Sequence, residues 1–125
     1  MAFKIAASPT YKVDVVVHFP GEDGKLRKQS FVAVFKRLTQ GEIETLRDRI
    51  AARNNGALLA TEPQPISDRE LLDEVLVGWE GVQDEDGNEL LFNEANKDAL
   101  LALHPTQPRL VAAYLKSLTD AREKN

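Results

Sequence analysis

The stretch that decides the fold is YKVDVVVHFPGEDGKLRKQSFVAVFKRL, residues 11–38. Apolar and polar residues alternate in its first part, which places every second residue from Val13 to Phe19 on one side of a strand. The segment PGEDGK has the composition of a turn, and LRKQSFVAVFKRL after it is typical of a second strand. The pattern therefore predicts a β-hairpin over residues 10–38.

The second strand is apolar on both faces at its centre, between Phe31 and Phe35. A two-stranded hairpin is only marginally stable in water, so at least one of its faces has to be covered. We expect helices of the same chain to cover one face. The other face, which carries Val32 and Val34, is then a candidate surface for a partner.

Signals for helix starts follow the hairpin. Thr39 with Glu42, and Ser67 with Glu70, form capping boxes, in which each side chain accepts a hydrogen bond from the backbone of the other residue. Asn93 is a suitable cap for a short third helix. These signals predict helices that begin close to each of the three caps.

The spacing of apolar residues predicts how the helices pack. In the helix that begins at Ser67, Trp79 lies one turn further along the same apolar stripe as the leucines. The final helix, which begins after Pro105, repeats this spacing with Leu110 and Tyr114. Both helices therefore have one side suited to a hydrophobic core.

We thus expect an α+β fold, a β-hairpin followed by a mostly helical part of about four helices. The expected organisation is a single domain (1–125) with the hairpin (10–38) and a helical part (39–122) that includes a connector (57–66) and an acidic turn (80–93).

The composition limits the classes of function. The chain has 125 residues, a net charge of −4 and no cysteine, which excludes disulfides, thiolate catalysis and cysteine-ligated zinc. An acidic protein lacks the positive surface that nucleic-acid phosphates require. No apolar run reaches about 20 residues, the length of a membrane-spanning helix. Nucleic acid and membrane are therefore not expected as partners.

The charges are unevenly distributed along the chain. Residues 1–62 carry ten Lys and Arg against seven Asp and Glu, whereas residues 63–125 carry six against thirteen. Such a distribution is typical of two solvated faces, and it also suits head-to-tail self-association through opposite charges. Both interpretations stay open at this point.

The acidic segment DEDGNE, residues 84–89, does not fit a calcium loop of the EF-hand type. If Asp84 takes the first position, Glu89 stands where a glycine is required, and Ala95 stands where the last glutamate is required. The segment instead predicts a turn with its carboxylates in water. The two histidines, His18 and His104, have no neighbour at ligand spacing. We therefore expect no enzyme activity, no metal and no cofactor.

Trp79 has two interpretations. Its indole packs against Leu91 and Phe92 as the chain returns from the acidic turn, which would bury about 150–250 Å² of aromatic surface. Alternatively, it is an exposed anchor for a partner, because tryptophan is enriched at interface hot spots. We favour packing.

The order of these features resembles a known family. From Trp79 to Phe92 the sequence reads WEGVQDEDGNELLF, which follows the pattern W-x-G-V-x-D-x-x-G-x-x-L-x-F. Asn93, a leucine-rich helix, a break at Pro105 and a final helix come next. This arrangement is similar to the tail assembly chaperones of long-tailed bacteriophages over residues 67–120, while the N-terminal hairpin matches only in character.

The resemblance implies a non-catalytic protein that acts in the host cytoplasm. Members of this family are thought to coat the long, apolar, helical tape measure protein until the tail tube assembles around it, which suggests a homo-oligomer. Many also have a longer product of ribosomal frameshifting, whose extension is thought to recruit the tail tube protein. The ending EKN fits a slippery codon run, GAA-AAA-AAC. The implied partners are therefore the tape measure protein and, through such an extension, the tail tube protein.

Two other functions stay open from the sequence. One is a structural tail or neck protein that remains in the virion, and the other is a small metal-binding regulator or enzyme that uses the acidic loop. Under the chaperone interpretation, an apolar surface has to meet the client. The candidate partner-binding residues are Val32, Val34, Trp79, Phe92, Leu110 and Tyr114.

Overall fold

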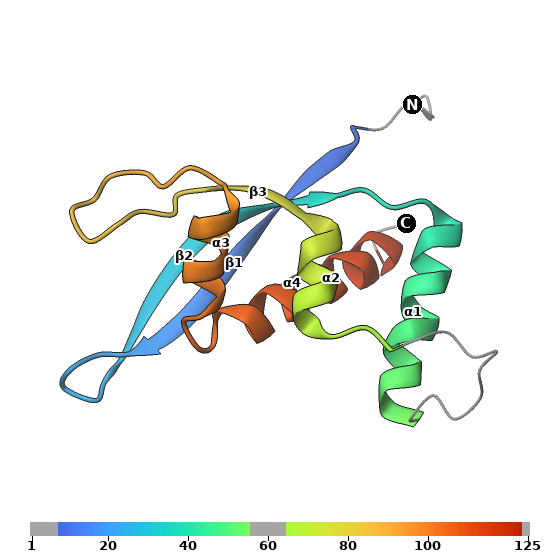
Figure 1. Ribbon diagram of the computed structural model, residues 1–125, viewed down its shortest axis with the longest axis horizontal. Coiled ribbons are helices and arrows are strands. Elements are labelled where there is room, and N and C mark those ends of the chain that lie inside the picture. Colours follow the sequence, from blue (N-terminus) through green and yellow to red (C-terminus); the bar gives the residue numbers. More distant parts are fainter. Residues whose placement is uncertain (1–7, 56–64, 124–125) are drawn as a thin grey trace.

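The structure is a computed structural model that describes residues 8–55 and 65–123 (Figure 1). The predicted connector (57–66) lies mostly outside this described part. A hairpin followed by four helices confirms the predicted α+β fold, and a third strand adds to it. In chain order the elements are β1 (Thr10–Pro20), β2 (Leu26–Lys36), α1 (Gln40–Asn55), α2 (Asp68–Val75), β3 (Leu76–Glu80), α3 (Glu94–Leu101) and α4 (Thr106–Glu123).

The strands form one antiparallel sheet in the order β1-β2-β3. β1 and β2 pair along their whole length, from Thr10 opposite Lys36 to Pro20 opposite Leu26. The turn between them has Gly24 at φ +79°, a left-handed conformation that glycine adopts without a steric penalty. The predicted hairpin is therefore confirmed.

One face of the sheet contributes to the hydrophobic core. Val15, Val17, Ala33 and Phe35 are at most 1 % exposed and pack with residues of α2 and α4. Because successive side chains of a strand point to opposite faces, the odd-numbered residues lie on the core side of the sheet and the even-numbered ones point away from it. The odd-numbered residues in 11–19 and 31–35 are buried or half-buried. Figure 1 shows α2, α3 and α4 beside the sheet, with α1 away from the hairpin turn.

The helix α4 is anchored by two fully buried side chains. Leu110 and Tyr114 are both 0 % exposed, and the Tyr114 ring meets the Phe35 ring edge to face, with 5.0 Å between the ring centres. Burial raises the pKa of the Tyr114 hydroxyl. Both residues were candidate partner contacts in the sequence, but in this structure they are buried in the core.

All three predicted helix starts are confirmed. The Thr39 Oγ1 atom accepts a hydrogen bond from the Glu42 N–H, and the Glu42 carboxylate accepts one from the Thr39 N–H, which lowers the pKa of Glu42. Ser67 and Glu70 make the same reciprocal pair at the start of α2. Asn93 caps α3 through its side-chain oxygen. Each cap satisfies backbone N–H groups that have no partner inside the helix.

The predicted position of Trp79 on a helix is wrong. The helix α2 ends at Val75, and the next five residues form β3, in which Trp79 lies opposite Ala33 of β2. The reason is tertiary: the edge of β2 presents backbone groups that need hydrogen-bond partners, and β3 provides them. Gly78, a poor helix former, weakens the competing helix.

Candidate functional site

The even-numbered residues of β1 and β2 form a surface that we call the outer face. Its apolar members include Val16, which is 40 % exposed, and Val32 and Val34, which are half-buried. The described helices that pack on the sheet meet its other face, where the core lies. The outer face is therefore a partly apolar surface left in contact with solvent.

Charged side chains divide the outer face. Lys12 of β1 lies opposite Val34, and Glu80 of β3 lies opposite Val32, yet the two charged groups form an ion pair at 2.6 Å. The ion pair must therefore cross β2 over its two valines, with the aliphatic part of Lys12 above them. A shallow hollow of about 610 Å³ beside this pair includes Val16 and Val32 in its lining. The outer face thus combines apolar contact area with charges of both signs.

A second hollow lies near the hairpin turn, and we call it the hairpin-end cavity. It has a volume of about 280 Å³ and opens to solvent where the core-side face of the hairpin meets the end of α3. Its most buried lining residues include Val17 and Val82, which are 1 % and 7 % exposed. The lining residues are Val17, Phe19, Gln29, Ser30, Phe31, Gly81, Val82, Gln83, Leu100, Leu103 and Thr106.

Two features mark this cavity. Its lining residues carry no charge, so an occupant has no ion pair to make inside it. In addition, the Thr106 Oγ1 atom is buried and has no hydrogen-bond partner among the described residues. An unpaired buried hydroxyl destabilises a fold by about 1–3 kcal/mol.

Trp79 packs where the chain returns from the acidic turn. Its ring lies edge to face on Phe92, with 4.9 Å between the ring centres, and its Nε1–H donates to the carbonyl oxygen of Leu90 at 2.9 Å. The predicted contact with Phe92 is confirmed. The expected contact with Leu91 is wrong, because Leu91 points to solvent and is 78 % exposed.

The acidic segment forms the predicted turn. The Asp84 carboxylate accepts hydrogen bonds from the backbone N–H groups of Asp86 and Asn88, at 2.9 Å and 3.0 Å, and Gly87 takes φ +84°. The remaining carboxylates point to solvent. Across residues 8–55 and 65–123, no group of three or more His, Asp or Glu side chains is arranged to hold a metal ion. The turn therefore presents negative charge next to the hairpin-end cavity.

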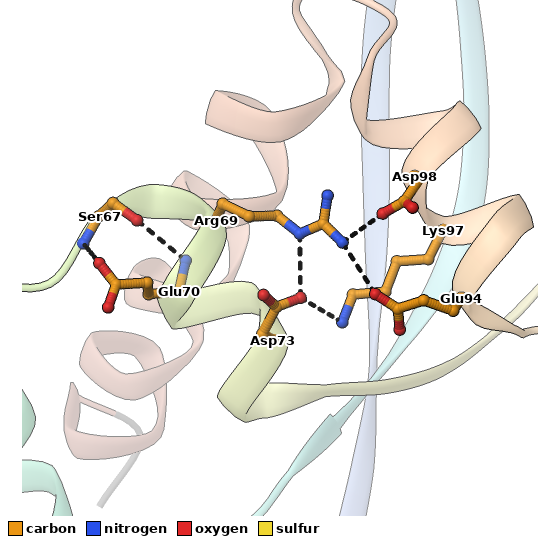
Figure 2. Close-up of polar contacts among 7 residues, drawn as sticks. All are labelled: Ser67, Arg69, Glu70, Asp73, Glu94, Lys97 and Asp98. Carbon is orange, nitrogen blue, oxygen red and sulfur yellow. Dashed lines mark hydrogen bonds and ion pairs between the residues drawn. The ribbon is translucent and has the colours of Figure 1, made fainter.

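An ion-pair network joins α2 to α3 (Figure 2). On α2, the Arg69 Nε atom lies 3.0 Å from the Asp73 carboxylate. The same guanidinium contacts Glu94 and Asp98 of α3. The Lys97 Nζ atom of α3 lies 2.7 Å from the Asp73 carboxylate, and the Lys97 side chain is only 6 % exposed. The network fixes both ends of the segment between the two helices, which contains β3 and the acidic turn.

The network also affects protonation. The hydrogen bond from Lys97, and after it the one from Arg69, holds the pKa of Asp73 below its ordinary value. In turn, hydrogen bonds to Asp98 and Asp73 raise the pKa of Arg69. Asp73 and Arg69 therefore stay charged at neutral pH, and the ion pairs of the network hold α2 and α3 together.

The structure does not bring the six candidate partner-binding residues into one surface. Val32 and Val34 lie on the outer face, while Trp79 and Phe92 pack against each other, half-buried. Sequence analysis missed the hairpin-end cavity and its exposed rim residue Leu103, which is 54 % exposed. No sequence signal marks Leu103, because its spacing from Leu100 fits the stripe of a helix; in the structure α3 ends at Leu101, and Leu103 lies in the connection to α4.

The family model described as phage tail assembly chaperone matches residues 1–125, which includes the hairpin. No curated protein and no solved structure matches the chain. In the part of the chain that the structure describes, no helix has the length and apolar character to cross a membrane. Because the family model matches along its entire length, this chain belongs to the phage tail assembly chaperone family.

Proposed function

We propose that this protein carries out its role in tail assembly by associating with copies of itself and covering the tape measure protein. A long helical protein with apolar stripes aggregates unless another surface covers those stripes. The association takes place in the host cytoplasm, before the tail tube surrounds the client. The protein has no chemical step to perform under this proposal, since covering a surface requires only complementary contacts.

The outer face is the observation that carries this proposal. Val16, Val32 and Val34 remain partly exposed on a sheet whose other face is already buried in the core. Burying apolar surface contributes about 25 cal/mol per Å², so each valine that a client covers adds to binding. The Lys12–Glu80 ion pair lies among these valines, and it gives a polar rim that keeps the free protein soluble.

Self-association draws support from β1. This strand forms one edge of the sheet over eleven residues, and an open edge is able to pair with a strand of another molecule. A row of such copies would extend the outer face along a client. A longer, frameshifted product would take a place in the same row and carry an extension for the tail tube protein.

The outer face is tested by adding charge to it. The variants Val32→Glu and Val34→Glu, alone and together, are co-expressed with a fragment of the tape measure protein, and the soluble fraction of that fragment is measured. We expect the double variant to lose most of the solubilisation while its circular dichroism spectrum stays that of the folded protein. Buried valine contacts would be replaced by carboxylates that must be desolvated on binding.

A matched control for the single variants adds one carboxylate at another exposed position, Thr45→Glu on α1. It should solubilise the client as the wild type does. If the double variant at Val32 and Val34 also solubilises the client fully, the outer face is not the covering surface. Mass spectrometry of purified particles tests the chaperone role itself, which requires that the protein be missing from the finished virion.

A further inference from the structure

We infer that the hairpin-end cavity is a docking site for an apolar side chain on a basic amphipathic helix of a tail protein. The inference rests on the proposed function, because it takes the partner to be an apolar helical client. It adds a second contact, separate from the outer face, and it specifies the charge of the partner. Volume, rim and surrounding charge each support it.

The volume suits a side chain better than a cofactor. Cavities of about 150 Å³ lined by apolar residues hold a benzene molecule, and sites for larger ligands begin at about 300 Å³. The hairpin-end cavity, at about 280 Å³, accepts a leucine or phenylalanine side chain with some space left over. Its walls are apolar at depth, where Val17 and Val82 lie, and polar but neutral at Gln29 and Gln83.

The rim indicates that the occupant offers more than one apolar side chain. Leu103 lines the mouth of the cavity and is 54 % exposed. A partner that fills the cavity and also covers Leu103 has to present a row of apolar side chains. Apolar side chains at positions i, i+3, i+4 and i+7 of a helix provide such a row of contacts around one central anchor.

Charge complementarity selects a basic helix. Gln83 of the cavity wall leads directly into the acidic turn, where Asp84, Glu85, Asp86 and Glu89 are exposed. At the hairpin turn the charge of Arg27 is offset by Asp23, 3.3 Å away. The acidic turn therefore brings negative charge to one side of the cavity mouth, and lysines or arginines on the polar face of the helix are attracted to it.

The test uses a fluorescent synthetic helical peptide with leucines at i, i+3, i+4 and i+7 and lysines on the opposite face. Fluorescence polarisation measures its binding to the full chain. We expect saturable binding that weakens about tenfold in Leu103→Glu, which corresponds to losing the burial of one apolar side chain. Leu103→Met keeps an apolar rim and should bind as the wild type does.

Two control peptides and one further measurement complete the design. A peptide with glutamates in place of the lysines, and one with serines in place of the leucines, should both bind weakly. Equal binding of the glutamate peptide, or equal binding to Leu103→Glu, would overturn the inference. It would also be overturned if Leu103→Glu lowers the oligomeric mass of the protein alone, since a second copy would then be the occupant.

The outcomes separate this inference from the proposed function. Loss of client solubilisation in the Val32→Glu and Val34→Glu double variant, together with peptide binding that Leu103→Glu leaves unchanged, would keep the proposed function and reject the cavity as a docking site. The reverse pattern would place the client in the cavity and leave the outer face without that role.

Discussion

Lys97 is the residue whose environment departs most from expectation. A lysine side chain that is 6 % exposed needs an anionic partner, and Asp73 provides it at 2.7 Å. Removing the partner would leave a nearly buried cation without its carboxylate, whereas removing the cation would leave a carboxylate that is 47 % exposed and able to meet water. The two members of the pair are therefore not equivalent.

This asymmetry predicts different effects for the two substitutions. Asp73→Asn should lower the free energy of unfolding at pH 7 by about 1–2 kcal/mol, while Lys97→Met, which keeps the shape and loses the charge, should change it by less than about 1 kcal/mol. Chemical denaturation of both variants measures the difference. In the Lys97→Met background, Asp73→Asn should have a smaller effect, since only its ion pair with Arg69 is then lost. Equal losses for the two single variants would contradict the argument.

The same pair predicts a dependence on pH. The pKa of Asp73 is lower in the folded than in the unfolded protein, so its ionisation stabilises the fold above the ordinary pKa of 3.8 and this contribution is lost as the pH falls through the lowered value. The difference in stability between the wild type and Asp73→Asn should therefore shrink below pH 4 or so. A difference that stays constant as the pH is lowered further, through this range, would exclude the charge as its cause.

Thr106, like Tyr114, has a buried hydroxyl that makes no hydrogen bond among the described residues. Its Oγ1 atom has no hydrogen-bond partner among the described residues, and the whole residue is 0 % exposed. Thr106→Val replaces the hydroxyl by a methyl group of similar size and should raise the free energy of unfolding by about 1 kcal/mol. Thr106→Ser keeps the hydroxyl, removes the methyl group and should be less stable than the wild type. Thermal unfolding compares the three proteins, and a less stable valine variant would show that the hydroxyl is satisfied.

At the level of elements, local signals in the sequence were sufficient wherever the structure depends on local contacts. The hairpin follows from alternation and a glycine turn, and the helix starts follow from caps at Thr39, Ser67 and Asn93. The strand β3 was missed because Leu76 and Trp79 continue the apolar spacing of α2. These residues form a strand because the edge of β2 is available to pair with them, and this is a tertiary feature that the local sequence does not show.

The candidate site was less predictable than the fold for the same reason. The position of Val32 and Val34 on the face away from the core could be predicted, because five consecutive apolar residues of one strand place apolar side chains on both faces of the sheet. The hairpin-end cavity joins side chains from β1, β2, the loop after β3 and the end of α3. No local pattern connects these segments. Leu110 and Tyr114 were misplaced because an amphipathic stripe does not tell whether the core or a partner covers it.

Gly41 in α1 and Gly87 in the acidic turn differ in backbone conformation, so replacing each by alanine should change stability in opposite directions. A Cβ atom at Gly41 or at Gly87 would meet no other atom within 4 Å, so packing does not distinguish them. Gly41 lies in the first turn of α1, and Gly41→Ala should stabilise the protein by about 0.5 kcal/mol through helix propensity. Gly87→Ala should destabilise it by about 1 kcal/mol, since φ is +84°. Chemical denaturation decides, and equal effects of the two variants would reject the assigned turn conformation.

In the whole molecule, the charge asymmetry of the sequence is partly neutralised by folding. Lys12 of the hairpin pairs with Glu80, and Arg53 of α1 pairs with Asp68 of α2, so cations of the first half meet anions of the second half within one chain. An excess nevertheless remains in the hairpin, residues 10–38, which carry six Lys and Arg against three Asp and Glu. The acidic turn presents the opposite charge to solvent.

This remaining asymmetry predicts how the proposed self-association depends on salt. If the basic hairpin of one copy meets the acidic turn of the next, raising the NaCl concentration from about 0.01 M to about 1 M shortens the screening length from about 30 Å to about 3 Å and should weaken the contact. Sedimentation velocity at a fixed protein concentration should then show a falling average mass. A mass that stays constant or grows with salt would contradict charge pairing. It would indicate that copies join through strand pairing along β1 or through apolar burial, neither of which requires opposite charges.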